Sequence, residues 1–229
     1  MGATRVLVGT DSGHLGRDGA DDDVCGRSGV AVACDDEVEG ADVITPIQVA
    51  TARRVWILCR SVAREIWLLK PPTPGYADAV AWMLYMLAAY ESAGFLARRQ
   101  WRFLRTSTGG AFSLWQIECA GIAAARVAVE QTSAMRERCL VWLYRWQGVW
   151  PGSLADTLLA VQDRDGDALG CLCARVYHLL DPAPVPEGLE GIAVYCKEHH
   201  NYGGKATSEK YLNALRVWAP VVDREWRVT

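Results

Sequence analysis

The chain has 229 residues, of which 51% are apolar and 22% charged, so it is long and apolar enough to bury one sizeable core. This composition excludes a disordered chain and makes two large domains unexpected. The formal net charge of −3 hides an uneven distribution: residues 1–41 hold nine acidic and three basic side chains, whereas the remaining 188 residues hold 18 acidic and 21 basic ones.

The first 41 residues differ in composition from the rest and are predicted to form a separate appendage. Two short β-like apolar runs, at residues 5–8 and 30–34, flank a stretch rich in Gly and Asp. This pattern fits either a hairpin or a mobile segment. No apolar signal-peptide core stands at the start, and no apolar run reaches the ~20 residues that span a bilayer. We therefore expect no export signal and no membrane span.

The cysteine and histidine patterns argue against a disulfide scaffold and against a metal site. No Cys-x-x-Cys pair occurs, and the four histidines do not repeat at a zinc-ligand spacing. Most of the cysteines lie in apolar helical patterns, which predicts buried free thiols made in a reducing cytoplasm. No cofactor is expected. The eight cysteines are Cys25, Cys34, Cys59, Cys119, Cys139, Cys171, Cys173 and Cys196.

From residue 42 onward the sequence predicts a succession of helices. Thr45 and Gln48 form the pattern of a capping box with Pro46 at the first helical position. Apolar residues then follow helical spacing as far as Leu69, and the prolines from Pro71 onward end the helix. Further helices are expected at about residues 77–91, 119–131, 133–147, 154–162, 166–180, 187–199 and 208–218.

The second predicted helix places one carboxylate in an unusual position. Residues 77–89 are apolar on every side, so this helix is expected in the core, with Glu91 at its C-terminal end and Gly94 as the stop. Partial desolvation and the negative end of the helix dipole both disfavour the charged carboxylate there. A carboxyl group kept protonated near neutral pH is suited to general acid catalysis. The alternative is a solvated helix-terminal residue.

Between the helices predicted from residue 42 onward, the segment from Gly110 to Ile117 is the only strand-like one. Strand alternation places Gln116 and Glu118 on one face and Trp115 on the other. Glu118 is therefore the candidate for a second carboxylate at the site.

Three motifs in order resemble a known family. Glu-Ser-x-Gly-Phe stands at residues 91–95, Gly-Gly-Ala-x-x-Leu-Trp-Gln-x-Glu at 109–118, and Tyr-x-Lys-x-x-x-Asn at 195–201. Together they resemble the soluble lytic transglycosylase branch of the lysozyme-like superfamily, and more closely the lysozyme-like proteins of tailed-phage virions and lysis systems. The resemblance covers roughly residues 44–218. It implies a mainly α (α+β lysozyme-like) fold with one small β excursion after the catalytic helix, and a transglycosylase domain over residues 42–229.

The resemblance also implies a reaction. Such enzymes cleave the MurNAc–GlcNAc glycosidic bond of peptidoglycan with one Glu as acid and then as base. The 6-hydroxyl of the muramic acid attacks C1 and gives a 1,6-anhydro product. Glu91 holds that position here. Two alternatives stay open: a hydrolase that uses Glu91 together with Glu118, and a site without activity.

Substrate-binding roles follow from the resemblance by position. Gln116 and Asn201 resemble the amides that bind the acetamido groups of the sugars, and Ser92 resembles the hydroxyl beside the acid. Tyr195 or Tyr202 is expected to hold the Glu91 side chain or to stack on a sugar ring. The full predicted substrate-binding set is Ser92, Ser113, Gln116, Tyr195, His200, Asn201 and Tyr202.

The expected partners are peptidoglycan glycan strands and other phage virion proteins. Four arginines between residues 98 and 105 either steer an anionic polymer to the site or are ordinary solvated charges. No nucleic-acid-binding motif is present, so the protein is not expected to recognise a nucleic acid sequence. The protein is expected to be made in the host cytoplasm, to associate with the virion, and to act in the periplasm and cell wall during genome ejection through the tail or during lysis. The alternative is an inactive structural or ejection component of the virion.

Overall fold

The computed structural model describes residues 44–98, 111–201 and 204–223. The predicted appendage of residues 1–41, and Tyr202, lie outside the described residues. The described part is mainly helical with one two-stranded sheet, which confirms the prediction of a mainly α fold. Its elements are α1 (Pro46–Glu65), α2 (Pro74–Glu91), β1 (Ala111–Phe112), β2 (Ile117–Glu118), α3 (Cys119–Gln131), α4 (Ser133–Arg145), α5 (Leu154–Ala160), the 3-10 turn η2 (Arg164–Gly166), α6 (Asp167–Leu179), α7 (Leu189–Tyr195), the π-helix η3 (Cys196–His200) and α8 (Ser208–Val222).

Helix α1 begins where the capping pattern predicts. The backbone N–H of Gln48 donates to the Thr45 hydroxyl at 3.2 Å, and the Gln48 side chain accepts from the Thr45 backbone at 3.0 Å. The capping box is therefore confirmed, with Pro46 in the first turn.

Helix α1 ends earlier than the apolar spacing predicts. Ile66 is already extended, and Leu69 is 95% exposed. The backbone carbonyl of Ile66 accepts from Arg175 Nε at 3.1 Å, and that of Trp67 accepts from an Arg138 guanidinium nitrogen at 2.7 Å. Because side chains of α6 and α4 satisfy these carbonyls, the chain leaves the helix before the prolines are reached.

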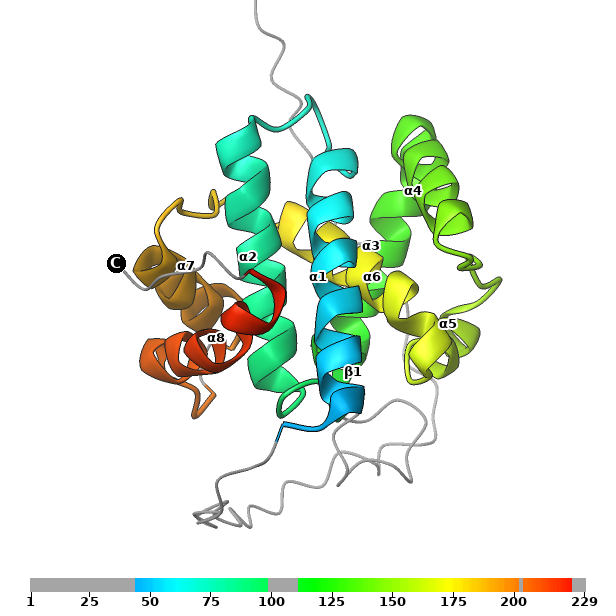
Figure 1. Ribbon diagram of the computed structural model, residues 1–229. Helices are drawn as coiled ribbons and strands as arrows, with labels where there is room; N and C mark the ends of the chain where they lie inside the picture. The colour runs from blue at the N-terminus through cyan, green and yellow to red at the C-terminus, as the bar shows by residue number, and fades with distance from the viewer. Residues whose placement is uncertain (1–43, 99–110, 202–203, 224–229) are drawn as a thin grey trace, which may run out of the picture. The chain divides into compact units, whose positions relative to one another are not determined.

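Helix α2 lies in the core, as its all-round apolar sequence predicts. It packs against α1, α6, α7 and α8, and Figure 1 shows it running beside α1. It starts at Pro74, three residues before the predicted start, because the Thr73 hydroxyl caps the backbone N–H of Tyr76 at 3.3 Å. Eleven of its residues are buried, among them Leu84 and Met86 with no exposed surface. Burying each large apolar side chain contributes about 1.5–3 kcal/mol to the stability of the fold. Helix α2 is therefore held firmly in the core, and Glu91 lies at its C-terminal end.

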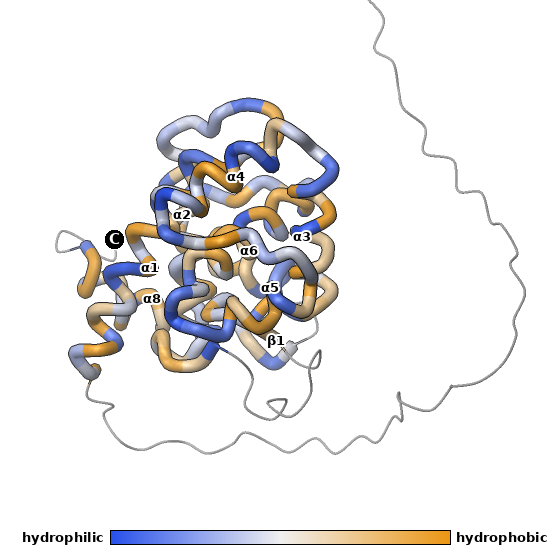
Figure 2. Tube along the Cα trace, turned by 90° about the vertical axis from the view of Figure 1, so that its right-hand side faces the viewer, coloured by the Kyte–Doolittle hydropathy of each residue, from blue (hydrophilic) through white to orange (hydrophobic). Residues whose placement is uncertain are grey.

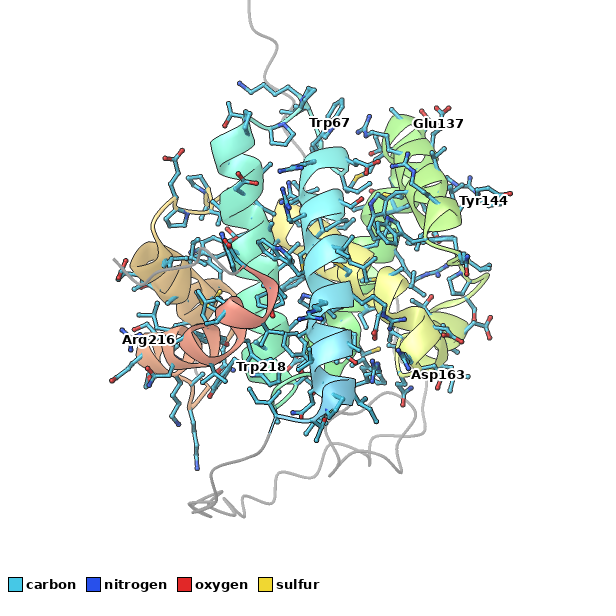
Figure 3. The ribbon with its side chains drawn as sticks, in the orientation of Figure 1. Trp67, Glu137, Tyr144, Asp163, Arg216 and Trp218 are labelled. Atoms are coloured by element: carbon cyan, nitrogen blue, oxygen red, sulfur yellow. The ribbon has the colours of Figure 1, made fainter. Side chains whose placement is uncertain are left out.

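The remaining helices flank this central pair. In Figure 1, α7 and α8 lie beside α2, whereas α4 and α5 lie on the other side of α1. Figure 3 shows Glu137 and Tyr144 pointing outward from α4, and Trp218 lying where α8 meets the central helices. Among the described residues no helix is both long and apolar enough to cross a bilayer. Figure 2 shows hydrophilic residues interrupting the hydrophobic ones along the helices.

The helix predicted at residues 187–199 is divided in two. Helix α7 ends at Tyr195, and a π-helical turn follows from Cys196 to His200. The backbone N–H of Asn201 donates to the Cys196 carbonyl at 3.2 Å, five residues back. Wider turns of this kind are frequent at functional sites.

The six cysteines within the described residues are free, and five of them are buried: Cys59, Cys139, Cys171, Cys173 and Cys196. Burial raises the pKa of the Cys139 and Cys173 thiols to about 12, so neither forms the reactive thiolate near neutral pH. We expect iodoacetamide to label Cys119 in the native protein and the five buried thiols only after denaturation. Peptide mass spectrometry without reductant checks this, and native labelling of the five would contradict it.

Candidate active site

A tight turn after α2 fixes the position of Glu91. Gly94 has a φ of +71°, and its backbone N–H donates to the Ala89 carbonyl at 2.9 Å. A β-carbon on Gly94 would lie 2.8 Å from the Trp218 ring, so the close approach of α8 also requires glycine here. The predicted role of Gly94 as the helix stop is therefore confirmed. Gln48 adds a hydrogen bond from Nε2 to the Gly94 carbonyl at 3.0 Å, which ties the turn to the start of α1.

Ser92, the predicted hydroxyl beside the acid, is fully buried in the same turn. Its Oγ donates to the Ala88 carbonyl at 2.5 Å and accepts from the Phe95 backbone N–H at 2.8 Å. In this structure Ser92 therefore shapes the turn that carries Glu91.

The Glu91 carboxylate is held by two donors from the C-terminal part of the chain. The Tyr211 hydroxyl donates to Oε1, and Asn201 Nδ2 donates to the same oxygen at 3.3 Å. Among the described residues, Oε2 has no hydrogen-bond partner. The two donors orient the carboxyl group and leave Oε2 as the oxygen that can give or take a proton.

Tyr211 holds the Glu91 side chain, as was expected of Tyr195 or of Tyr202, which lies outside the described residues. Burial and then the neighbouring Glu91 raise the pKa of Tyr211 far above its ordinary value, so its hydroxyl keeps the proton that it donates. Tyr195 does not contact Glu91: its ring stacks on His199 at 4.4 Å, and its hydroxyl lies 3.5 Å from His178 Nδ1.

One feature of the sequence points to Tyr211. It stands with Leu215 and Trp218 on one apolar stripe of α8, which indicates core packing. A tyrosine on such a stripe still needs a partner for its hydroxyl.

The segment predicted as a strand over residues 110–117 is instead a hairpin with two short strands. Ala111 pairs with Glu118, and Phe112 with Ile117. The turn between them contains Ser113 at φ +65° and Gln116 at φ +48°. Because these residues adopt left-handed conformations, the chain reverses and the predicted strand alternation does not hold.

Polar groups of this turn are bonded to backbone. Gln116 is 7% exposed, and its Nε2 donates to the Ser113 carbonyl at 2.7 Å and to the Ala97 carbonyl at 3.3 Å. Ser113 Oγ accepts from the Trp115 backbone N–H at 3.2 Å. Trp115 is a core residue whose Nε1 donates to the Leu84 carbonyl at 2.8 Å. The turn is thereby anchored to α2.

The charges of both candidate carboxylates affect the pKa of His200. Burial lowers the pKa of His200, whereas Glu91, a hydrogen bond to the Trp115 backbone and Glu118 raise it. Glu118 is exposed, and Gln116, which was expected on the same face, is buried. His200 Nδ1 is buried and has no partner among the described residues. The structure thus brings Asn201 to Glu91, and both candidate carboxylates are near enough to His200 for their charges to raise its pKa.

Of the four arginines between residues 98 and 105, Arg98 alone lies within the described residues. Arg98 forms a two-bond ion pair with the buried carboxylate of Asp167 at 2.7 and 2.9 Å, and Arg54 also bonds that carboxylate. Asp167 therefore holds Arg98 in place, while the two arginines and the one carboxylate together keep one positive charge. Arg99, Arg102 and Arg105 lie outside the described residues.

A hollow along α3 and α4 does not coincide with Glu91, and the described residues form no cluster of metal ligands. The hollow has a volume of about 610 Å³ and contains none of the predicted site residues. In the described part of the chain no three His, Cys, Asp or Glu side chains are grouped so as to hold a metal ion. The hollow is lined by Glu130, Gln131, Ser133, Arg136, Glu137, Leu140 and Val141.

Comparisons with known proteins assign no family. No protein-family model matches the chain, and neither the curated proteins nor the solved structures contain a match.

Proposed function

We propose that this protein is a phage-type peptidoglycan lytic transglycosylase that cleaves the MurNAc–GlcNAc glycosidic bond with Glu91 as its single acid and base. The arrangement of Glu91 carries the proposal. One carboxyl oxygen is held by Tyr211 and Asn201, the other has no partner among the described residues, and the group stands at the end of a buried helix. The order of the three motifs in the sequence supports the choice of substrate.

In this proposal Oε2 of Glu91 first donates its proton to the glycosidic oxygen, and the bond from C1 to that oxygen breaks. The carboxylate that results is stabilised by the Tyr211 hydroxyl and the Asn201 amide at Oε1. Oε2 then takes the proton of the muramic 6-hydroxyl while O6 bonds to C1. The proton returns to Glu91, and no water is consumed.

The biological setting is part of the proposal. We expect the protein to be made in the host cytoplasm, to associate with other virion proteins, and to act on glycan strands of the cell wall during genome ejection or lysis. The support for this setting is the resemblance of the motifs to lysozyme-like phage proteins.

A second candidate function is that of an inactive lysozyme-like structural or ejection component. One observation favours it: Gln116, predicted to bind an acetamido group, is buried and uses its amide nitrogen on two backbone carbonyls. If substrate does not displace these bonds, the site lacks one of its expected contacts.

Zymography on purified peptidoglycan, followed by mass spectrometry of the products, tests the proposal. We expect cleared zones and muropeptides with 1,6-anhydro ends, which are one water lighter than hydrolysed ends. Reducing ends would indicate the hydrolase that uses Glu91 with Glu118. A lack of cleavage on peptidoglycans from several bacteria would favour the structural component.

Replacing Tyr211 by Phe tests the hold on Glu91. Tyr211→Phe keeps the ring, which packs 4.4 Å from the Tyr90 ring, but removes the hydroxyl donor. Loss of one hydrogen bond to a charged group costs about 1.5–3 kcal/mol, so we expect turnover to fall by about tenfold or more. Steady-state kinetics measures this, and Tyr90→Phe is the matched control because the Tyr90 side chain makes no hydrogen bond to Glu91 among the described residues. Unchanged turnover in Tyr211→Phe would contradict the assigned role.

A further inference from the structure

Asn201 directly follows the π-helix and is bonded on both sides of its own backbone. Its backbone N–H bonds the Cys196 carbonyl at 3.2 Å, and its carbonyl accepts from the Gly204 backbone N–H at 3.0 Å. These two bonds tie the Asn201 backbone to Cys196 and to Gly204.

One lysine bonds both Asn201 and Gly204. Lys197 Nζ donates to the Asn201 carbonyl at 2.9 Å and to the Gly204 carbonyl at 2.8 Å. Lys197 lies within the π-helix, four residues before Asn201. A cation there also interacts favourably with the carbonyl end of the helix. The Lys197 ammonium group thus links Gly204 to Asn201, the residue at the end of the π-helix.

Gly204 leaves the space that the Asn201 side chain fills. A β-carbon on Gly204 would lie 1.6 Å from Asn201 Oδ1 and 2.7 Å from Asn201 Cγ. Any side chain at position 204 would therefore displace the Asn201 amide. The amide has little room for error, because its 3.3 Å bond to Glu91 Oε1 is near the limit for a hydrogen bond.

We infer that Lys197 is a positioning residue, which holds the Asn201 amide on Glu91 by clamping the backbone carbonyls of Asn201 and Gly204 together. This inference rests on the proposed function, because the amide matters for catalysis only if Glu91 is the acid. Lys197 itself makes no bond to Glu91 among the described residues, so its effect on turnover passes through Asn201.

A double-mutant cycle tests whether Lys197 affects turnover through Asn201. We expect Lys197→Met and Asn201→Ala each to lower kcat by about tenfold, and the double variant to lose no more than Asn201→Ala alone. Lys197→Arg should restore most of the activity, because a guanidinium also donates to two carbonyls. Lys210→Met, which removes an exposed lysine of α8, is the matched control and should match the wild type. Additive losses in the double variant, or no rescue by arginine, would overturn the inference.

Hydrogen exchange followed by NMR separates this inference from the proposed function. In the wild type the Gly204 backbone N–H and the Asn201 side-chain amide should exchange slowly, and Lys197→Met should speed both by tenfold or more, whereas Lys210→Met should not. If the wild type cleaves no peptidoglycan, the proposed function fails, and this experiment still decides whether the clamp exists. Unchanged exchange in Lys197→Met would overturn the clamp whatever the activity.

Discussion

Glu91→Gln is expected to lower turnover by at least ~100-fold, the usual effect of losing general acid catalysis, while the protein keeps its fold. A glutamine oxygen at the Oε1 position still accepts from Tyr211 and Asn201, so the contacts that position the side chain remain. The amide has no proton to give to the glycosidic oxygen and cannot take one from the muramic 6-hydroxyl. Steady-state kinetics on purified peptidoglycan, with thermal melting followed by circular dichroism, measures both properties.

Glu118→Gln is the matched control for this experiment. Glu118 is exposed and is the residue at the start of α3, where its side chain makes no capping bond. The same chemical change at this position should lower turnover only slightly. Equal losses in the two variants would indicate a two-carboxylate mechanism, and full activity in Glu91→Gln would remove Glu91 from the mechanism.

Much of the helical framework could be predicted because its signals are local. The capping box of Thr45 and Gln48 depends only on neighbouring residues, and the stop at Gly94 is marked by the glycine itself, although Trp218 also requires a glycine there. The early end of α1 was not predictable, because it depends on Arg175 and Arg138 from distant helices. The hairpin was missed because Ser113 and Gln116 adopt the positive φ that usually marks glycine.

The candidate site could be predicted only in part for the same reason. Glu91 was placed at the end of a buried helix from the apolar pattern alone. Its partner Tyr211 is 120 residues away, and the helical spacing of α8 shows only that this tyrosine faces the core. Asn201 was expected to face a sugar, whereas its amide bonds Glu91. A pattern along the chain gives the face of a helix, but the atom that a side chain reaches depends on packing between helices.

A stacked pair of histidines beside the site, of which His178 is buried and His200 half-buried, is expected to make the fold sensitive to acid. His178 is 4% exposed and stacks on His200, with ring centroids 5.5 Å apart. His178 Nε2 has no partner among the described residues, and Nδ1 has only the Tyr195 hydroxyl at 3.5 Å. Burial lowers the pKa of His178 well below its ordinary value, and His200, Arg175 and His199 lower it further. Burial also lowers the pKa of His200, against the opposite effects of Glu91, the Trp115 backbone and Glu118.

The free energy of unfolding should therefore fall as the pH drops below about 6.5, the ordinary pKa of histidine, because the unfolded chain binds protons that the folded pair does not. Each histidine contributes a slope of up to about 1.4 kcal/mol per pH unit between the unfolded and folded pKa values, and none above that window. His178→Phe keeps an aromatic ring in the core and removes one of these groups. Its stability relative to the wild type should be constant from about pH 8 to pH 7 and should improve steadily toward pH 5. Urea unfolding followed by circular dichroism across this range measures the difference, and a difference independent of pH would show that His178 takes up its proton equally in the folded and unfolded states.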